Sequence, residues 1–281
     1  MSTSTRDPAA FVGLVRITGR PAVRRACRRV AWPAASVALV LAALQAAVST
    51  HILSENSFPT VPQLLAAFVE LLGRGDFWGA VLETVRGTAV GFGIAALIGV
   101  PAGVLLGTSD VLFHASRFVV EFLRPIPVVA IIPLVVLLYG TGFTSKLVLV
   151  IFAALFPILL QTIYGVRDTD PVALETARSY RLGRLRELTM VMLPNALPFV
   201  ATGMRISAAI ALLVAISAEL IIGAPGIGQE IINAQAGSAV ALMYGLILAT
   251  GLLGVLLNAV LTVLERRLVP WGAASQRKET P

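Results

Sequence analysis

The sequence predicts an all-α membrane protein with several transmembrane helices. Of its 281 residues, 57% are hydrophobic and only 13% are charged, and that charged share is about half the average for soluble domains. The mean hydropathy is +0.87, and several apolar runs reach the roughly 20 residues that cross a bilayer as a helix. A soluble globular enzyme and a disordered chain are both excluded, because neither accommodates so much apolar side chain.

Six apolar segments are long enough to span a bilayer, and they divide the chain. A basic arm (1–29) precedes the first span, and a short amphipathic helix is expected at 62–72, in a link that ends at residue 79. A core of five spans (80–264) and a polar tail (265–281) follow. The six expected spans are residues 30–48, 83–107, 118–139, 147–165, 198–222 and 239–264.

The basic arm followed by an apolar run also has the pattern of a cleaved signal peptide, with Ala46-Ala47 near the exit of the run. A membrane anchor is favoured over a signal peptide, because the run is long enough to span and further spans follow it.

The distribution of basic residues predicts the orientation of these spans. Of the 22 lysines and arginines, 17 fall in 1–29, 108–117, 166–193 and 265–281, whereas the opposite links hold only Arg74 and Lys146. Basic residues collect on the cytoplasmic side, so both termini are expected in the cytoplasm. This asymmetry accounts for the net charge of +7 without a nucleic-acid partner, and the arm can contact anionic lipid head groups.

The second expected span carries small residues on one face. They recur at every fourth position, as Gly91, Ala95, Gly99, Gly103 and Gly107. In lipid, such a face allows another helix backbone to approach closely, and van der Waals contact then drives the association. The pattern predicts tight helix packing and indicates no chemistry.

The longest polar interruption (166–193) predicts a helix–turn–helix with mixed charge. Asp170 can cap a helix that begins at Pro171 and continues to Arg181, and Gly183 is placed to stop it. A second short helix is expected over 185–192. The expected apolar contacts are Leu174, Ala177, Leu182 and Leu185. These ordered start and stop signals favour a helical element over a linker with incidental helicity.

This interruption resembles the EAA loop of permease subunits in bacterial ABC importers. The resemblance rests on Glu175-Thr176-Ala177-Arg178, Gly183 and Leu193-Pro194. Further features follow in the same order across roughly 80–271 and are similar to the nitrate, sulfonate and taurine branch. They are Arg124-Pro125-Ile126-Pro127, Ile132-Pro133-Leu134, Asp170-Pro171, Ala218-Glu219, Gly226-Ile227-Gly228 and Pro270-Trp271. One departure is Arg181, which stands where the family loop usually has a glycine, so the turn is expected to be displaced or tighter.

The resemblance implies a type I importer permease in the bacterial inner membrane, working as a homodimer. Loop 166–193 would be the cytoplasmic coupling helix that docks on a separate ATPase. The implied partners are a second copy of the permease, two ABC ATPase subunits and an extracytoplasmic substrate-binding protein. The implied substrate is a small anion such as a sulfonate, taurine or nitrate. The chain lacks a GxxxxGK[ST] phosphate loop, so ATP is expected to be used by the partner, and this chain is expected to bind no cofactor.

Ionisable side chains inside the spans are candidates for the translocation pathway, since each costs about 2.5–3.5 kcal/mol to insert. Arg124, beside Pro125 and Pro127, either lines the path of an anion or extends to the interface as a long basic side chain. Arg205 has the same two interpretations. Glu219 would repel an anion, so structural pairing or gate closure is the better interpretation of it.

Two further expectations concern neighbouring positions. Glu121 and Arg124 are three residues apart and are expected to neutralise each other on one helix face. The glycine-rich link 223–237 opens with Gly223-Ala224-Pro225-Gly226-Ile227-Gly228. This opening is expected to form a turn that shapes the outer gate, and it is no phosphate cradle because it follows a membrane helix rather than a strand.

Two other functional classes were weighed against a transport subunit of an ATP-driven importer. An ion-driven secondary transporter would need paired carboxylates or histidines at mid-membrane and an inverted repeat, and the span interiors hold no histidine and no carboxylate pair. An intramembrane enzyme would need a nucleophile–base or metal set. His51, His114 and the single Cys27 form none, so no catalytic or metal-binding residue is expected. The gradient-driven transporter remains the alternative.

Overall fold

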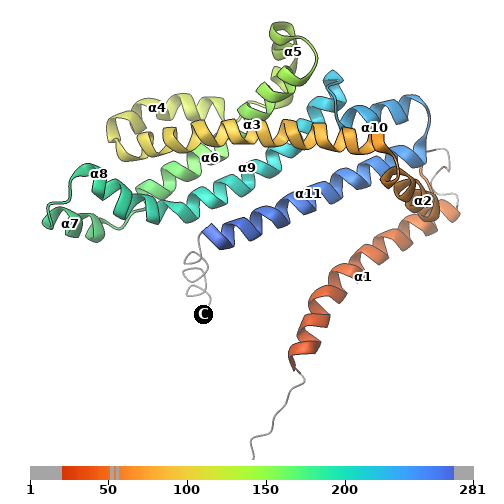
Figure 1. Cartoon of the computed structure of the whole chain (residues 1–281), viewed down its shortest axis with the longest axis horizontal. Coiled ribbons are helices and arrows are strands. Elements are labelled where there is room, and N and C mark those ends of the chain that lie inside the picture. The colour runs from red at the N-terminus through yellow and green to blue at the C-terminus, as the bar shows by residue number, and fades with distance from the viewer. Residues whose placement is uncertain (1–20, 51–53, 55–56, 269–281) are drawn as a thin grey trace, which may run out of the picture. The chain divides into compact units, whose positions relative to one another are not determined.

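The computed structural model describes residues 21–50, 54 and 57–268, and every regular element in these residues is a helix (Figure 1). The chain separates at Val61–Pro62 into two units. In the N-terminal unit, α1 (Pro21–Ser49) covers the residues of the predicted first span (30–48), but the apolar helix identified within it, Ala38–Ser49, is shorter than a membrane span. The N-terminal part of the predicted arm (residues 1–20) and most of the predicted tail lie outside the described residues.

The C-terminal unit is built from the remaining helices. They are α2 (Val61–Leu72), α3 (Gly75–Thr108), α4 (Asp110–Leu123), α5 (Val128–Tyr139), α6 (Phe143–Arg167), α7 (Pro171–Ser179), α8 (Arg184–Glu187), a π-helical turn (Leu188–Met192), α9 (Leu193–Ile222), α10 (Ile227–Ala236) and α11 (Val240–Leu268). The short helix expected at 62–72 is confirmed as α2.

Four helices of the described residues are long and apolar enough to cross a membrane: α3, α6, α11 and the run that contains α9. The predicted single span at 118–139 is wrong in detail, because two helices, α4 and α5, meet there at 90° and make a fifth span only if counted together. The bend lies at Arg124–Pro127. Pro125 and Pro127 have no amide hydrogen to continue the helical bonding, and each disfavours helical backbone at the residue before it.

The small-residue face of α3 packs against α6, which confirms the predicted close contact. All five small residues of this face (Gly91, Ala95, Gly99, Gly103 and Gly107) are buried. A Cβ atom built on Gly91 would lie 2.5 Å from a Val150 methyl carbon, and one on Gly103 would lie 2.5 Å from the Thr162 Cβ. Contact positions rise together along both helices, so α3 and α6 run parallel, as two spans separated by one other must.

On its other side α6 packs against α9, and these two helices run antiparallel. Gly165 of α6 lies against the backbone of Ala196, and Gly203 of α9 lies against the carbonyl of Pro157. The Ser207 hydroxyl donates a hydrogen bond to the backbone carbonyl of Ala154. Small residues thus bring α6 into backbone contact with a helix on each of two sides, and α6 is the most deeply packed element of the described chain.

The turn expected at the start of the glycine-rich link lies at residues 223–226, but the rest of the link is a helix that was not expected, α10. Its residues Ile227, Ile231 and Ala234 recur on one helix face and are buried in a second apolar cluster with Phe77 of α3 and Leu246 of α11. The apolar spacing of a helix therefore outweighs the glycines, which fall at its first turn and just beyond its end.

The packing of α3 on α6 makes a directional prediction for Gly103. Gly103→Ala forces a Cβ to within 2.5 Å of Thr162 and 2.9 Å of the Leu159 carbonyl, and overpacking of this kind costs about 1–3 kcal/mol. We expect a lower melting temperature for the purified variant in detergent.

The matched control is Gly93→Ala, on the same helix, where the new Cβ meets nothing within 4 Å. This variant should melt at or slightly above the wild-type temperature, because alanine is the better helix former. Equal melting temperatures for the two variants would contradict the assigned packing.

Candidate functional site

Residues 168–192, the α6–α9 connector, join the ends of α6 and α9 at the end of the C-terminal unit away from α10 (Figure 1). The predicted helix start is confirmed. The Asp170 carboxylate accepts a hydrogen bond from the Val172 amide at 2.8 Å, and Pro171 occupies the first helical position, where no amide hydrogen is needed. The start of α7 is therefore fixed by local chemistry alone.

The predicted stop at Gly183 is wrong, since α7 ends two residues before Arg181. Arg181 adopts left-handed backbone with φ 54°. Its amide donates to the Arg178 carbonyl at 2.8 Å, and the Leu182 amide donates to the Ala177 carbonyl at 3.1 Å. This pair of bonds is a Schellman cap, which glycine usually closes. Gly183 instead has φ −67° and precedes α8 as its N-cap, so an arginine occupies the position that favours glycine.

Side chains hold α7 against α8. The Arg178 guanidinium pairs with the Glu187 carboxylate at 3.2 Å, and Glu187 is largely buried. Ala177 is 5% exposed, and Leu174 and Leu182 are half-buried. The expected apolar contact at Leu185 is wrong, because that side chain is 74% exposed. The two helices therefore form one ordered unit on a small contact area.

The outward face of the connector combines charge with exposed apolar side chains. Glu175 and Thr176 are exposed. The Thr176 hydroxyl donates to the Val172 carbonyl of its own helix at 2.7 Å, whereas no described residue bonds the Glu175 carboxylate. The large exposed apolar side chains here are Val172, Tyr180, Leu185 and Met190. An apolar surface rimmed by polar groups is typical of a protein contact site.

The connector returns to the bundle through a π-helical turn, Leu188–Met192, before α9 begins at Leu193. The expected helix at 185–192 is therefore helical throughout but changes its hydrogen-bonding register. Pro194 lies in the first turn of α9 and cannot donate a backbone hydrogen bond. Such single π-turns occur as changes of register inside helices, and this one joins the connector to Leu193-Pro194 without a break in helical structure.

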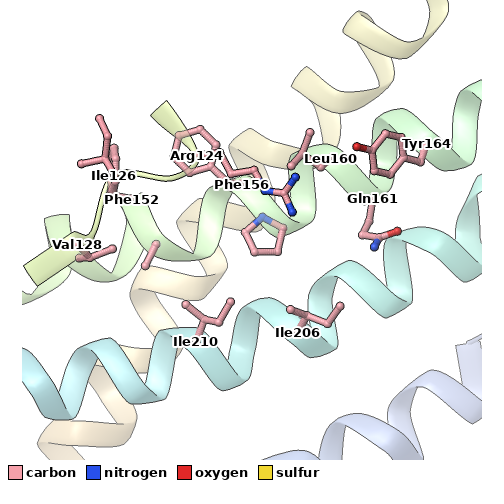
Figure 2. A pocket seen from close by; sticks show the side chains of 12 residues that line it. Arg124, Ile126, Val128, Phe152, Phe156, Leu160, Gln161, Tyr164, Ile206 and Ile210 are labelled. Carbon is pink, nitrogen blue, oxygen red and sulfur yellow. The ribbon is translucent and has the colours of Figure 1, made fainter. Parts of the chain in front are cut away.

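A cavity of about 380 Å³ lies between the α4–α5 bend and the middle of α6 and α9. Arg124, at the bend, extends its guanidinium toward α6, near Leu160 (Figure 2). No hydrogen bond or ion pair to the Arg124 guanidinium is formed by any described residue. Gln161 and Tyr164 supply the other polar groups of the lining. The rest of the lining is apolar: Ile126, Val128, Phe152, Ala153, Phe156, Pro157, Leu160, Ile206 and Ile210.

The other predicted pathway residues lie outside this lining. Pro125 and Pro127 form the bend beside it. Arg205 pairs with Glu265 at 3.3 Å and so ties α9 to α11. The expected pairing of Glu121 with Arg124 is wrong, because Glu121 pairs with Arg117 at 2.7 Å. This pairing leaves the Arg124 charge available to the cavity.

Glu219 belongs to a fully buried network near the opposite end of α9. Its carboxylate pairs with the Lys146 ammonium of α6 at 3.1 Å and accepts from the Thr84 hydroxyl of α3 at 3.0 Å. All three side chains are 0% exposed. Sequence reasoning placed Lys146 in a polar link and missed this partner. The signal was available, since Lys146 and Glu219 are opposite charges at the same predicted end of adjacent spans.

Comparisons with known proteins agree with this architecture. Residues 99–271 match the family model described as "Binding-protein-dependent transport system inner membrane component". The chain is 30% identical to a Bacillus subtilis protein assigned as an aliphatic sulfonates transport permease protein, over 83% of this chain and 85% of that one. It is 28% identical to the taurine transport system permease protein of Escherichia coli, over 87% and 90% of the two chains.

A solved structure of a methionine ABC transporter, in an inward-facing conformation, has the same fold. It superposes with a TM-score of 0.60 at 22% identity, over 70% of this chain and 95% of that one. At this identity the match concerns the fold alone.

The left-handed residue in the connector can be tested by substitution. Left-handed backbone costs a non-glycine residue about 1–2 kcal/mol, so Arg181→Gly should stabilise the connector by about 1 kcal/mol. Amide hydrogen exchange of residues 171–187 would then slow about fivefold.

Gly183→Ala is the matched control, because Gly183 has ordinary backbone angles and open space around its Cα. It should leave exchange in the connector unchanged. If Gly183→Ala speeds exchange while Arg181→Gly has no effect, the turn lies at Gly183 after all.

Proposed function

The chain belongs to the family of binding-protein-dependent transport system inner membrane components, and from this premise we propose that it forms the translocation pathway for a small anion. As a permease subunit of an ABC importer it is a multi-pass inner-membrane protein and not an enzyme. ATP hydrolysis belongs to a partner ATPase subunit, and a substrate-binding protein is the other partner of such permeases.

We propose that the α6–α9 connector is the coupling element on which the ATPase docks. The observation that carries this proposal is the outward face of α7, an ordered helix with an unpaired carboxylate at Glu175 and exposed apolar neighbours. A capped helix fixed to two packed spans transmits displacement, whereas an unstructured loop would absorb it. Leu193-Pro194 continues this element into α9, and Gly183 lies at the start of α8, between the two short helices.

The connector is proposed to face the cytoplasm, with both termini on the same side. Its support is the 17-to-2 distribution of basic residues between the two sets of links, which follows the positive-inside rule. On this orientation α10 and the buried network lie at the outer end of the C-terminal unit, where a substrate-binding protein would deliver its cargo.

The cavity at the α4–α5 bend is proposed as one wall of the pathway. The free guanidinium of Arg124 offers charge-assisted hydrogen bonds to an oxyanion, in surroundings that are otherwise mainly apolar. This chemistry favours a sulfonate, taurine or nitrate over a cation. Pro125 and Pro127 hold the bend that presents Arg124, while the ion-paired Arg205 and Glu219 act through structure.

A second copy of the chain is proposed to enclose the pathway, with one ATPase docked on each copy. The support is the surface of α5, which carries large apolar side chains that no other described element covers. They are Val129, Leu134, Leu137 and Leu138, each more than half exposed.

The coupling assignment predicts the effect of reversing one charge. Glu175→Lys should reduce the ATPase recovered with the tagged permease about tenfold, as loss of a central contact does, and ATP-dependent uptake should fall with it. Membrane insertion should be unaffected, because the Glu175 carboxylate has no partner among the described residues.

Glu70→Lys is the control, since Glu70 is an exposed carboxylate on α2, far from α7 in the fold (Figure 1). This variant should recover the wild-type amount of ATPase. Normal recovery and uptake with Glu175→Lys would remove α7 from the interface.

The pathway assignment predicts a second effect, on anion uptake. Arg124→Gln should lower taurine or sulfonate uptake about tenfold, because a hydrogen bond to a charged group contributes about 1.5–3 kcal/mol. Arg124→Lys should retain part of the uptake, since it keeps the charge but loses the planar fork.

Arg117→Gln on α4 is the matched control, because this exposed arginine lies outside the cavity lining and pairs with Glu121. The variant should transport normally. Wild-type uptake by Arg124→Gln, measured in the same vesicles, would exclude the cavity as the anion path.

A further inference from the structure

The first turn of α10 is capped by side chains of two other helices. Its N-cap residue, Gly226, has no side chain to offer. The amide of Ile227 donates instead to the Thr84 hydroxyl at 2.9 Å, and the amide of Gly228 donates to the Glu219 carboxylate at 2.9 Å. A helix N-terminus carries unsatisfied donors and partial positive charge, so a carboxylate there is favourable. The position of α10 thus depends on α3 and α9.

Lys146 completes this buried network from α6. Its ammonium group has three donors, and all three are used. They bond the Glu219 carboxylate at 3.1 Å, the Pro225 carbonyl at 2.7 Å and the Glu83 carbonyl at 3.2 Å. No buried polar side-chain atom among the described residues lacks a partner. One lysine therefore joins α3, α6, α9 and the turn that precedes α10.

The fit of this turn onto the network requires bare backbone. Gly226 has φ 151°, and a Cβ there would lie 2.2 Å from the Glu219 carboxylate. A Cβ on Gly228 would lie 2.6 Å from the Glu219 Cβ and 2.7 Å from the Ile216 carbonyl. The hydrogen bonds of the network therefore require the first turn of α10 to lie in direct contact with the Glu219 carboxylate.

The same two helices carry the network and the connector. Lys146 lies in the first turn of α6, and Glu219 lies in the last turn of α9. The connector joins their other ends, about 30 Å away along the α6 axis. Because α6 and α9 touch backbone to backbone between these points, a displacement of the connector moves both ends of the pair together.

We propose that Lys146 and Glu219 are positioning residues that fasten α10 to the α6–α9 pair, so that motion at the connector is delivered to α10 as a moving part of the outer gate. This inference rests on the proposed function, because it requires an ATPase that moves the connector. If Lys146 and Glu219 only stabilised the fold, they would hold α10 in place, but the position of α10 would not change with the nucleotide bound to the ATPase.

The test measures α10 directly and needs no substrate. In a Cys27→Ser background, Asn233→Cys places a single thiol on the exposed face of α10. The permease is assembled with its ATPase in liposomes, and the rate of maleimide labelling is compared without nucleotide and after trapping with ATP and vanadate. In the chain with an intact network, the two states should differ about tenfold in labelling rate.

Two variants loosen the network in different ways. Glu219→Gln removes the charge pair, and Gly228→Ala displaces the seat of α10 without leaving a charge unpaired. In both, the labelling rate should become independent of nucleotide, while ATPase assembly and basal ATP hydrolysis are retained. Gly93→Ala, whose Cβ meets open space, is the matched control and should keep the full difference.

Three results would overturn the inference. A nucleotide-dependent difference that persists in both variants shows that α10 does not need the network to follow the connector. Loss of assembly in both variants assigns the network to stability alone. If the chain with an intact network assembles with no ATPase and shows no difference, the proposed function fails, and this inference fails with it.

Discussion

The antiparallel contact between α6 and α9 is the constraint on which the rest of this structure depends. Lipid gives two helices no hydrophobic reason to associate, so the contact must come from close van der Waals packing. Gly165 and Gly203 supply it by leaving no side chain between the backbones. Interiors packed this closely switch between discrete arrangements and do not deform smoothly. The pair therefore behaves as one body, and whatever is attached to its ends moves with it.

A buried ion pair such as Lys146–Glu219 is energetically costly. Its hydrogen bonds explain why one is found at the α10 end of the α6–α9 pair. Removing one partner of a buried pair typically costs about 3–5 kcal/mol, because the remaining charge is left uncompensated. Here both Lys146 and Glu219 are fully bonded, and several of their partners are backbone groups. Apolar side chains in place of both residues would preserve the packing but would leave those backbone groups without hydrogen-bond partners. The two charged side chains therefore bond the backbone around the turn at 223–226 as well as each other.

The sequence predicted the helical fold and the close face of α3, because hydropathy, small-residue spacing and capping residues act locally. It could not predict the bend at Arg124–Pro127 as two separate helices, since prolines permit either a kink or a break and tertiary contacts decide between them. It misjudged Arg181 for a related reason. A left-handed arginine violates local preference, and it occurs here in a turn flanked by the contact of Arg178 with Glu187. Lys146 and Glu219 lie 73 residues apart in the sequence. The predicted spans put both charges at the same end of adjacent helices, but they could not give the distance between the two side chains.

Among the described residues, the cavity lies between two well-packed helices and a poorly packed one. On one side are α6 and α9, each with many buried side chains, and on the other is α4, which buries none. Few buried contacts correspond to a low free energy of local opening, so displacement between these elements is easiest at the α4–α5 bend. Arg124 lies at that bend. In the proposed pathway, motion of the α6–α9 pair against the bend would change the distance from the Arg124 guanidinium to Gln161 and Tyr164, and so would change how tightly an anion is held. Because the Arg124 guanidinium has no partner among the described residues, release of an anion in the proposed pathway would break no ion pair on which the fold depends.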